Sequence, residues 1–383
     1  MTGRNACPTG DRQECLSYPM THLENFHRMM NRDRPSWLPL SLPMTPPIAD
    51  LLQKKKGTRS AVEAFDLDMR GVGPKIRSDE KAWRKAFARI GADVPKDAEV
   101  GFAGISHLVP SRKDVGKAYH FREMLHPLAA ITSVNQLRKL PWPNVKKREN
   151  FAHLSAAVAK IHAEGRVATG GCACTAFESA WYLRGMDNLF GDLIEGNGIS
   201  DWLLDWFTQR SIRVTRAYAK AGVDLIHLGD DVGTQRGMMM APDFWRQHLK
   251  GRLKSVVDAI RDASKRRSRV WIEYHTDGDV RDIIDELIEI GIDILNPCQP
   301  ECMPPAELVA RYKDRLGFSG LVGTQTTMPF GTPDDVRAVV AQAADFVRGG
   351  AAVLLAPTHV LEPEVPWRNI AALVGAVKKT RLF

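Results

Sequence analysis

The feature that most constrains the fold is a repeated pattern in which a short apolar run ends in polar residues and leads into a helix-length amphipathic stretch. Residues 269–272 predict a strand and residues 280–288 an amphipathic helix, because apolar positions recur with a period near 3.6. His275 and Asp277 lie between them. Alternate residues of a strand face the same way, so these two side chains are expected to point together at the carboxyl end of the strand.

Eight segments of the chain begin apolar and end polar in this way. Strands that alternate with helices favour a parallel sheet, and eight of them are enough to close a (β/α)₈ barrel, whose site lies at the carboxyl face. An open doubly wound sheet follows a similar rule, and we favour the α/β TIM barrel. The predicted strands are residues 37–42, 100–105, 166–171, 221–231, 269–272, 292–299, 316–325 and 351–359.

The domain organisation follows from the same pattern. Residues 1–34 are expected to form an N-terminal arm and a leading helix, and residues 35–383 a single barrel. The charged stretch at about 51–96 is interrupted by glycines and a proline, which predicts an insertion after the first strand.

Composition and charge argue against two classes of partner. The chain is 44% hydrophobic but has no apolar run of about 18 residues, and its start lacks the pattern of a secretory signal, so we expect a cytoplasmic protein with no membrane partner. The net charge of +8 comes from short basic clusters scattered along the sequence. A nucleic-acid partner is not expected, because such proteins concentrate positive charge on one face.

Carboxylates gather at two of the predicted strand ends. Asp230 and Asp231 follow one strand, and Glu273 and Asp277 flank His275 after another. Like charges that share a cleft raise at least one pKa, so Asp231 or Asp277 is the expected proton donor, with His275 as a relay. Asp230 is a further catalytic candidate, and Glu273 is a candidate for substrate binding.

Polar and aromatic side chains at other strand ends are candidates for substrate binding. Asn296, Gln299 and Gln325 are expected to orient a substrate through neutral hydrogen bonds, or else to close βα loops. Glu178 and Tyr182 follow the strand at 166–171, and the aromatic run around them predicts either a pocket wall or a helix core.

Several motifs in the second half of the chain carry a resemblance to a known family. Together, and in this order, they resemble the uroporphyrinogen decarboxylase superfamily, which implies a (β/α)₈ barrel with a deep cleft at its carboxyl face. The motifs are Gly-Asp-Asp-Val-Gly-Thr-Gln-Arg-Gly at 229–237, Ala-Pro-Asp-Phe-Trp at 241–245, His-Thr-Asp-Gly at 275–278, and the segments 294–300, 331–333, 356–359 and 365–370.

The resemblance is closer to the corrinoid-linked methyltransferase branch than to the haem-pathway decarboxylase. The decarboxylase carries an arginine-rich segment after its first strand, whereas residues 43–48 here contain no arginine. A substrate with eight carboxylates needs guanidinium donors. A decarboxylase of a smaller acid would need a cationic pocket, for which Arg236 and Arg184 are the candidates.

A metal site is a further implication of the resemblance. Zinc-dependent members of the branch bind the metal through a His-x-Cys pair and a later cysteine, and the matching positions here are His275, Asp277 and His359. Zinc sites of that type depend on cysteine sulfur, so a metal-free polar pocket is the favoured interpretation. The alternative is a divalent metal, zinc or another, on His275, Asp277 and His359, with His359 otherwise binding substrate.

The resemblance therefore implies a methyltransferase or demethylase that takes a methyl group from a small substrate. The acceptor would be tetrahydrofolate or a corrinoid on a separate protein, because no corrinoid-binding Asp-x-His-x-x-Gly motif is present. Two alternatives remain at this point: a decarboxylase of a small or tetrapyrrole-type acid, and a non-catalytic barrel that serves as a binding subunit.

Overall fold

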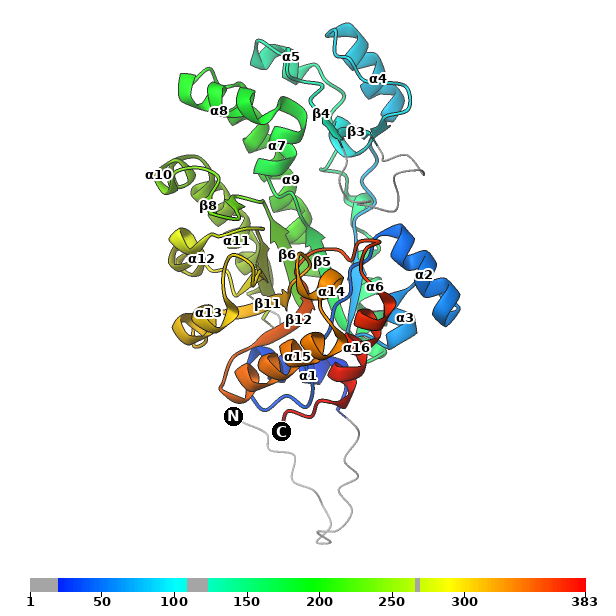
Figure 1. The fold of residues 1–383 in the computed structure, drawn as a ribbon. Helices are drawn as coiled ribbons and strands as arrows, with labels where there is room; N and C mark the ends of the chain where they lie inside the picture. Colours follow the sequence, from blue (N-terminus) through cyan, green and yellow to red (C-terminus); the bar gives the residue numbers. More distant parts are fainter. Residues whose placement is uncertain (1–19, 109–122, 266–268) are drawn as a thin grey trace, which may run out of the picture.

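The computed structural model describes residues 20–108, 123–265 and 269–383, and its centre is a curled, parallel seven-stranded sheet (Figure 1). Every residue of β11 and β12 is buried, as expected for strands covered on both faces. In spatial order the strands are β1 (Met69–Val72), β5 (Val167–Cys172), β6 (Leu225–Gly229), β9 (Trp271–His275), β10 (Ile294–Cys298), β11 (Gly317–Val322) and β12 (Val353–Pro357).

Helices pack around this sheet, and all of them except α1 come after one of its strands in the chain. Thr332 caps α15 and exchanges hydrogen bonds with Asp335 in a capping box. The helices that cover the sheet are α1 (His22–Met30), α6 (Leu154–Ala163), α9 (Ile199–Ala221), α11 (Gly251–Ser264), α12 (Ile284–Glu289), α13 (Pro305–Tyr312), α15 (Pro333–Arg348) and α16 (Trp367–Lys379).

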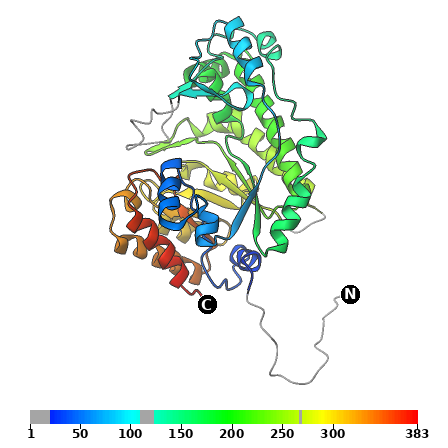
Figure 2. The same ribbon diagram turned by 90° about the vertical axis from the view of Figure 1, so that its right-hand side faces the viewer.

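A second group of elements lies apart from these helices. Figures 1 and 2 both place α4, β3 and α5 at the end of the molecule opposite α15 and α16. The remaining helices are α2 (Pro46–Lys56), α3 (Ala61–Phe65), α4 (Glu80–Arg89), α5 (Val134–Arg138), α7 (Phe177–Arg184), α8 (Met186–Glu195), α10 (Pro242–Trp245) and α14 (Thr327–Phe330). The short strands are β2 (Glu99–Val100), β3 (Ser106–Leu108), β4 (Glu123–Leu125), β7 (Gly233–Thr234) and β8 (Gly237–Met238). Single turns of 3₁₀ helix occupy Phe102–Gly104, Arg148–Asn150 and Arg281–Ile283, and a π-helical turn occupies Arg246–Lys250.

The last six predicted strands are confirmed, and the second one is wrong. Residues 100–105 were expected in the barrel, but Val100 belongs to a separate antiparallel sheet of β2, β3 and β4. The position beside β5 is taken by β1, which lies in the stretch predicted as an insertion. The sequence Met-Arg-Gly-Val is short and contains an arginine, whereas Val100–Ile105 is more apolar, so the hydrophobic pattern favoured the wrong segment.

The first predicted strand reaches the sheet through an isolated bridge. Leu40 pairs with Leu355 of β12, and the N–H of Ser41 donates to the carbonyl of Leu355 at 2.9 Å. On its other side, the carboxylate of Asp68 accepts the N–H of Leu40 at 3.1 Å and the indole N–H of Trp37 at 2.9 Å. Among the described residues, no strand ladder joins this segment to β1, so Asp68 makes the connection between them.

The expected N-terminal arm and leading helix, residues 1–34, fall only partly within the described residues. Residues 1–19 lie outside the described residues, and α1 occupies His22–Met30 of the rest. Across the described part of the chain, no helix combines the length and the apolar character needed to cross a membrane.

Candidate functional site

Asp231, His275 and Asp277 form a cluster at the carboxyl ends of β6 and β9, and we call these three residues the acidic trio. Nε2 of His275 lies 3.7 Å from Oδ1 of Asp231 and 3.7 Å from Oδ1 of Asp277. The N–H of Asp277 donates to Oδ1 of Asp231 at 2.8 Å. The sequence predicted that these side chains would meet at one rim of the sheet, and the structure places them together, with one potential metal-binding atom from each residue within 4.8 Å of the others.

Two glycines allow the loops that carry the trio to approach each other. A Cβ atom on Gly233 would lie 2.5 Å from the carbonyl oxygen of Asp277, and one on Gly278 would lie 2.6 Å from the backbone of Gly233. Gly278 also has a φ of +87°, which a residue with a side chain rarely adopts. The close passage of these two loops therefore depends on glycine at both positions.

His275 is held in one orientation by the neighbouring strands. Its Nδ1 lies 2.5 Å from Oδ1 of Asn296, and Nδ2 of Asn296 donates to Oγ of Ser319 at 2.8 Å. An amide oxygen can only accept, so Nδ1 carries a proton that it donates to Asn296. This hydrogen bond turns the other ring nitrogen, Nε2, towards the two carboxylates of the trio.

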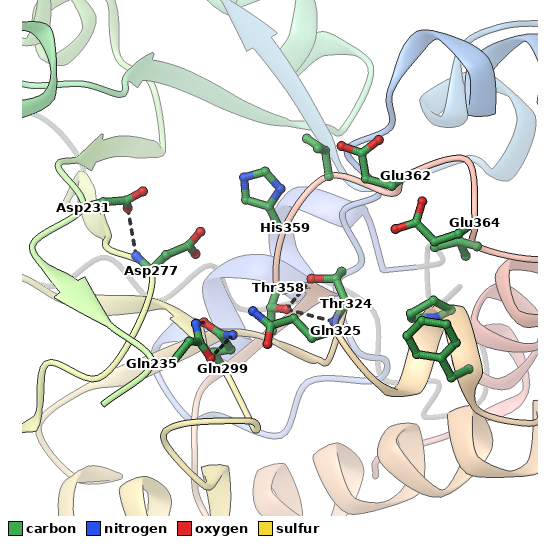
Figure 3. Close-up of a pocket in the computed structure, with 14 residues that line it drawn as sticks. Asp231, Gln235, Asp277, Gln299, Thr324, Gln325, Thr358, His359, Glu362 and Glu364 are labelled. Carbon is green, nitrogen blue, oxygen red and sulfur yellow. Dashed lines mark hydrogen bonds between the residues drawn. The ribbon is translucent and has the colours of Figure 1, made fainter. Parts of the chain in front are cut away.

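An outer cavity of about 500 Å³ opens beside the trio (Figure 3). Asp231 and Asp277 lie on one side of it, and its wall also contains Gln299, Gln325 and His359, which the sequence predicts as substrate-binding residues. Its described lining residues are Asp231, Gln235, Asp277, Gln299, Thr324, Gln325, Pro329, Phe330, Thr358, His359, Val360, Glu362, Glu364 and Val365.

The structure corrects the membership of the predicted metal triad. His275 and Asp277 are present in the cluster with metal-binding geometry, but the third member among the described residues is Asp231, and His359 is not part of it. His359 lies close enough to His275 for their charges to interact, since burial and then the charge of His275 lower the pKa of His359. The sequence motifs do not reveal this difference, because they give positions along the chain and not distances between side chains.

Asp230 has a different environment from its neighbour Asp231. Its carboxylate is buried and accepts hydrogen bonds from the N–H groups of Ala176 and Glu178, each at 2.9 Å, at the start of α7. Burial raises its pKa to about 7, although these backbone hydrogen bonds act in the opposite direction. Asp230 was predicted as a catalytic residue, and its contacts instead describe a side chain that anchors the first turn of α7.

Glu178 and Tyr182 lie one turn apart on α7 and are bonded to each other. The hydroxyl of Tyr182 donates to Oε1 of Glu178 at 2.6 Å. Burial, followed by the charges of Asp231 and Asp230, raises the pKa of Glu178 to about 8. A carboxyl group that is protonated at neutral pH therefore stands near the acidic trio.

A second histidine and carboxylate lie on the same two strands, and we call them the closed pair. Nδ1 of His227 on β6 lies 2.6 Å from Oε2 of Glu273 on β9. Burial opposes both charges, but the hydrogen bond and the charge of the partner outweigh it, so the pKa of His227 is raised and that of Glu273 lowered. Glu273 was predicted as a substrate-binding residue, whereas His227 was missed. The strand positions could have identified His227. His227 and Glu273 are each the third residue of their strand, and the two are direct neighbours in the parallel register.

The closed pair lines an inner cavity of about 350 Å³. The inner and outer cavities share Thr358, His359 and Val360 as wall residues. The inner cavity is lined by Ser41, Pro43, Met69, Ala173, His227, Glu273, His275, Asn296, Ser319, Leu354, Leu355, Ala356, Pro357, Thr358, His359 and Val360. Among the described residues that line these two cavities, none is an arginine or a lysine.

The two arginines considered for a cationic pocket lie elsewhere. Arg236 is exposed at the turn between β7 and β8 and is absent from the walls of both cavities, so its prediction as a substrate-binding residue is wrong for these cavities. Arg184 is buried and binds Asp192 at 2.8 Å, together with the carbonyl groups of residues 128, 129 and 131. Its guanidinium group is therefore used to hold α7 and α8 to the segment before them.

Comparisons with known proteins give a family and a fold. The family model described as uroporphyrinogen decarboxylase (URO-D) matches residues 105–380. A methyltransferase from Methanosarcina mazei has a similar structure, with a TM-score of 0.58 and 18% identity over 94% of this chain and 99% of that one. A phosphonopyruvate hydrolase aligns with a TM-score of 0.27 and 14% identity over 60% of this chain and 63% of that one. No curated protein matches the chain.

Proposed function

We propose that this chain, which belongs to the uroporphyrinogen decarboxylase family, is a methyltransferase that removes a methyl group from a small substrate. The observation that carries the proposal is the position of the acidic trio, whose members line both an outer and an inner cavity. Transfer of a methyl group requires a donor and an acceptor to approach one carbon atom from different sides, and two adjoining cavities provide that arrangement.

The acceptor in this proposal is a reduced corrinoid carried by a separate protein, with tetrahydrofolate as the alternative. The outer cavity is the larger of the two, with a volume of about 500 Å³, and its wall comes from the loops that follow β6, β9, β10, β11 and β12. A bulky acceptor can reach such a rim more easily than the interior of the sheet. The Methanosarcina mazei protein of similar structure is a methyltransferase, which supports methyl transfer as the reaction in this proposal.

The acidic trio is suited to hold a divalent cation. It offers one imidazole nitrogen and carboxylate oxygens without a thiolate, a set that suits a hard or borderline ion. The separations of 3.7 Å between Nε2 of His275 and the two carboxylate oxygens are too long for hydrogen bonds. A cation bound there would supply Lewis-acid stabilisation of the atom that leaves the methyl group. Asn296 would keep Nε2 of His275 directed at the ion, and Asp231 and Asp277 would balance its charge.

The same cavities disfavour the decarboxylase alternative. Recognition of a substrate with several carboxylates requires cationic donors, and guanidinium groups match carboxylates best. The described residues that line both cavities include aspartate, glutamate and histidine but no arginine or lysine. A polyanionic substrate would therefore meet carboxylates without a compensating charge.

The test is a methyl-transfer assay with purified protein. The full chain is incubated with cob(I)alamin and a panel of methylated ethers, amines and halides, and formation of methylcobalamin is followed by its visible spectrum, with tetrahydrofolate as the acceptor in parallel reactions. We expect transfer from at least one donor, and loss of transfer in Asp277→Asn. Release of carbon dioxide from carboxylated substrates, with no transfer from any donor, would overturn the proposal.

A further inference from the structure

We infer that the inner cavity is the binding site of the methyl donor and that the donor is a small, neutral methyl ether with an apolar body. This inference rests on the proposed methyl transfer and adds the class of substrate and its location. It follows from the size of the inner cavity, from the way its charges are paired, and from one unsatisfied hydrogen-bonding atom in its wall.

The members of the acidic trio line different cavities. Asp231 and Asp277 line the outer cavity, whereas His275 lines the inner one. The wall of the inner cavity comes from strand residues such as Asn296 and Ser319, so it lies inside the sheet. A methyl group placed at the trio by a donor in the inner cavity can be reached by an acceptor only from the outer one.

The volume of the inner cavity sets the size of the donor. An apolar cavity of roughly 150 Å³ is enough to bind benzene in another protein. The inner cavity here has about 350 Å³, which accommodates one substituted aromatic ring but not a corrinoid or a folate. The small reactant therefore belongs inside, and the large one outside.

Charge pairing in the inner cavity selects against charged donors. Glu273 is buried, and its charge is balanced by His227 at 2.6 Å. Apart from this pair, the histidines at 275 and 359 are the ionisable residues among its described lining residues. A donor with a net charge would lose its hydration without gaining a partner, which is costly, whereas a neutral donor would not.

His227 offers the donor a hydrogen-bonding position in the wall of the inner cavity. Nδ1 of His227 is used by Glu273, and Nε2 has no hydrogen-bond partner among the described residues. With Nδ1 of His227 held by Glu273, Nε2 is the ring nitrogen that can form a hydrogen bond with a polar group of the donor. The ring of His227 lies 5.6 Å from that of His275, so an oxygen bound there would carry its methyl group towards the trio. Pro43, Met69 and Ala356 supply apolar contacts for the rest of the donor.

The reaction that follows is balanced. The electron pair of the reduced corrinoid forms the new bond to the methyl carbon, and the electron pair of the carbon–oxygen bond leaves with the oxygen. The oxygen then takes a proton from water, so a methyl ether and a Co(I) corrinoid give an alcohol or phenol and a methyl-Co(III) corrinoid. No other oxidant or reductant is consumed.

Binding experiments with a defined probe test the location. Guaiacol, a neutral methoxyphenol, is titrated calorimetrically into the wild-type chain and into Ala173→Leu, whose larger side chain fills part of the inner cavity. We expect Ala173→Leu to weaken binding about tenfold or more, because the added side chain overlaps the ligand. The matched variant Gln325→Ala, in the outer cavity, should leave guaiacol affinity within about threefold. Thermal unfolding confirms that both variants are folded.

Charged analogues test the class of ligand. Phenyltrimethylammonium and methoxybenzoate are similar in size to guaiacol but carry opposite charges, and both should bind at least about tenfold more weakly. The inference is overturned if guaiacol binding is unchanged by Ala173→Leu, or if either charged analogue binds more tightly than guaiacol.

The methyl-transfer assay separates a failure of this inference from a failure of the proposed function. Transfer that is fully active in Ala173→Leu would overturn the inner cavity as the donor site and leave the methyltransferase proposal standing. Guaiacol binding that is lost in Ala173→Leu, together with no methyl transfer from any donor, would support the inner cavity as a site for neutral ethers and overturn the methyltransferase proposal.

Discussion

The closed pair and the acidic trio use the same residue types on the same two strands, yet they differ in how their charges are satisfied. In the closed pair, His227 and Glu273 are in direct contact at 2.6 Å. In the trio, His275 stands 3.7 Å from each of two carboxylates. The closed pair neutralises itself, whereas the trio has room for a further group between its members. The distance between histidine and carboxylate therefore separates a pair that stabilises the fold from a cluster that can bind a ligand.

The largest expected effect is on stability, from breaking the closed pair. His227→Leu leaves the buried carboxylate of Glu273 without its counter-ion, which should lower the free energy of unfolding by about 3 kcal/mol. Urea denaturation measures this change. The double variant His227→Leu/Glu273→Met should recover most of the loss, because an apolar pair can replace a buried ion pair. Equal instability of the single and double variants would contradict the comparison.

Disruption of the trio should affect activity and not stability. Asp277→Asn should reduce methyl transfer about 100-fold or more, because it removes one carboxylate from the group that we propose to hold a cation. Asp279→Asn is the matched control, since Asp279 lies two residues further on and is bound by Arg281 at 2.5 Å. Steady-state rates and metal content are measured for both variants. A metal content in Asp277→Asn equal to that of the wild type would exclude the trio as the cation site.

Orientation of His275 should matter less than the trio itself. Asn296→Ala removes the acceptor for Nδ1 and leaves the ring free to rotate. Loss of such a supporting residue typically costs about 10- to 100-fold in metal affinity or activity. Metal titration of the wild type and the variant measures the change, and an unaltered affinity would show that Asn296 does not orient the histidine.

The closed pair should also make stability depend on pH. The pKa of Glu273 is lowered below 4.5, so its contribution is present above that value and is lost as the pH falls through the lowered pKa. The pKa of His227 is raised above 6.5, so its contribution is present below that value and is lost as the pH rises through the raised pKa. The stability difference between the wild type and His227→Leu/Glu273→Met should therefore be largest between these two values. Unfolding measured across the range tests this, and a flat difference would argue against an ionised pair.

The smallest effect is expected at Arg236. Its side chain is exposed on the β7–β8 turn and lines neither cavity, so Arg236→Ala should change stability by less than about 0.5 kcal/mol and leave methyl transfer unchanged. A large loss of activity would instead indicate that this hairpin contacts a substrate or a partner.

The sequence predicted the strands and site residues that are marked by an apolar run with a polar end. Six strands were found because each is an apolar run with a polar end, and His275 and Asp277 were found because they lie at such an end. The strand β1 was missed because four residues that include Arg70 give no hydrophobic pattern. His227 was missed because its role appears only when the register places it beside Glu273. Arg236 was misplaced because the direction of a short hairpin is not encoded in residue spacing.

The contacts of Asp68 link the first described helix to the interior of the curled sheet. Besides Leu40 and Trp37, this carboxylate is bonded to Nδ1 of His22, in the first turn of α1, at 2.8 Å. The next residue, Met69, lies in the wall of the inner cavity. A change in the first helix can thus reach the space where we place the donor through Asp68, so we expect removal of α1 to alter ligand affinity from a distance.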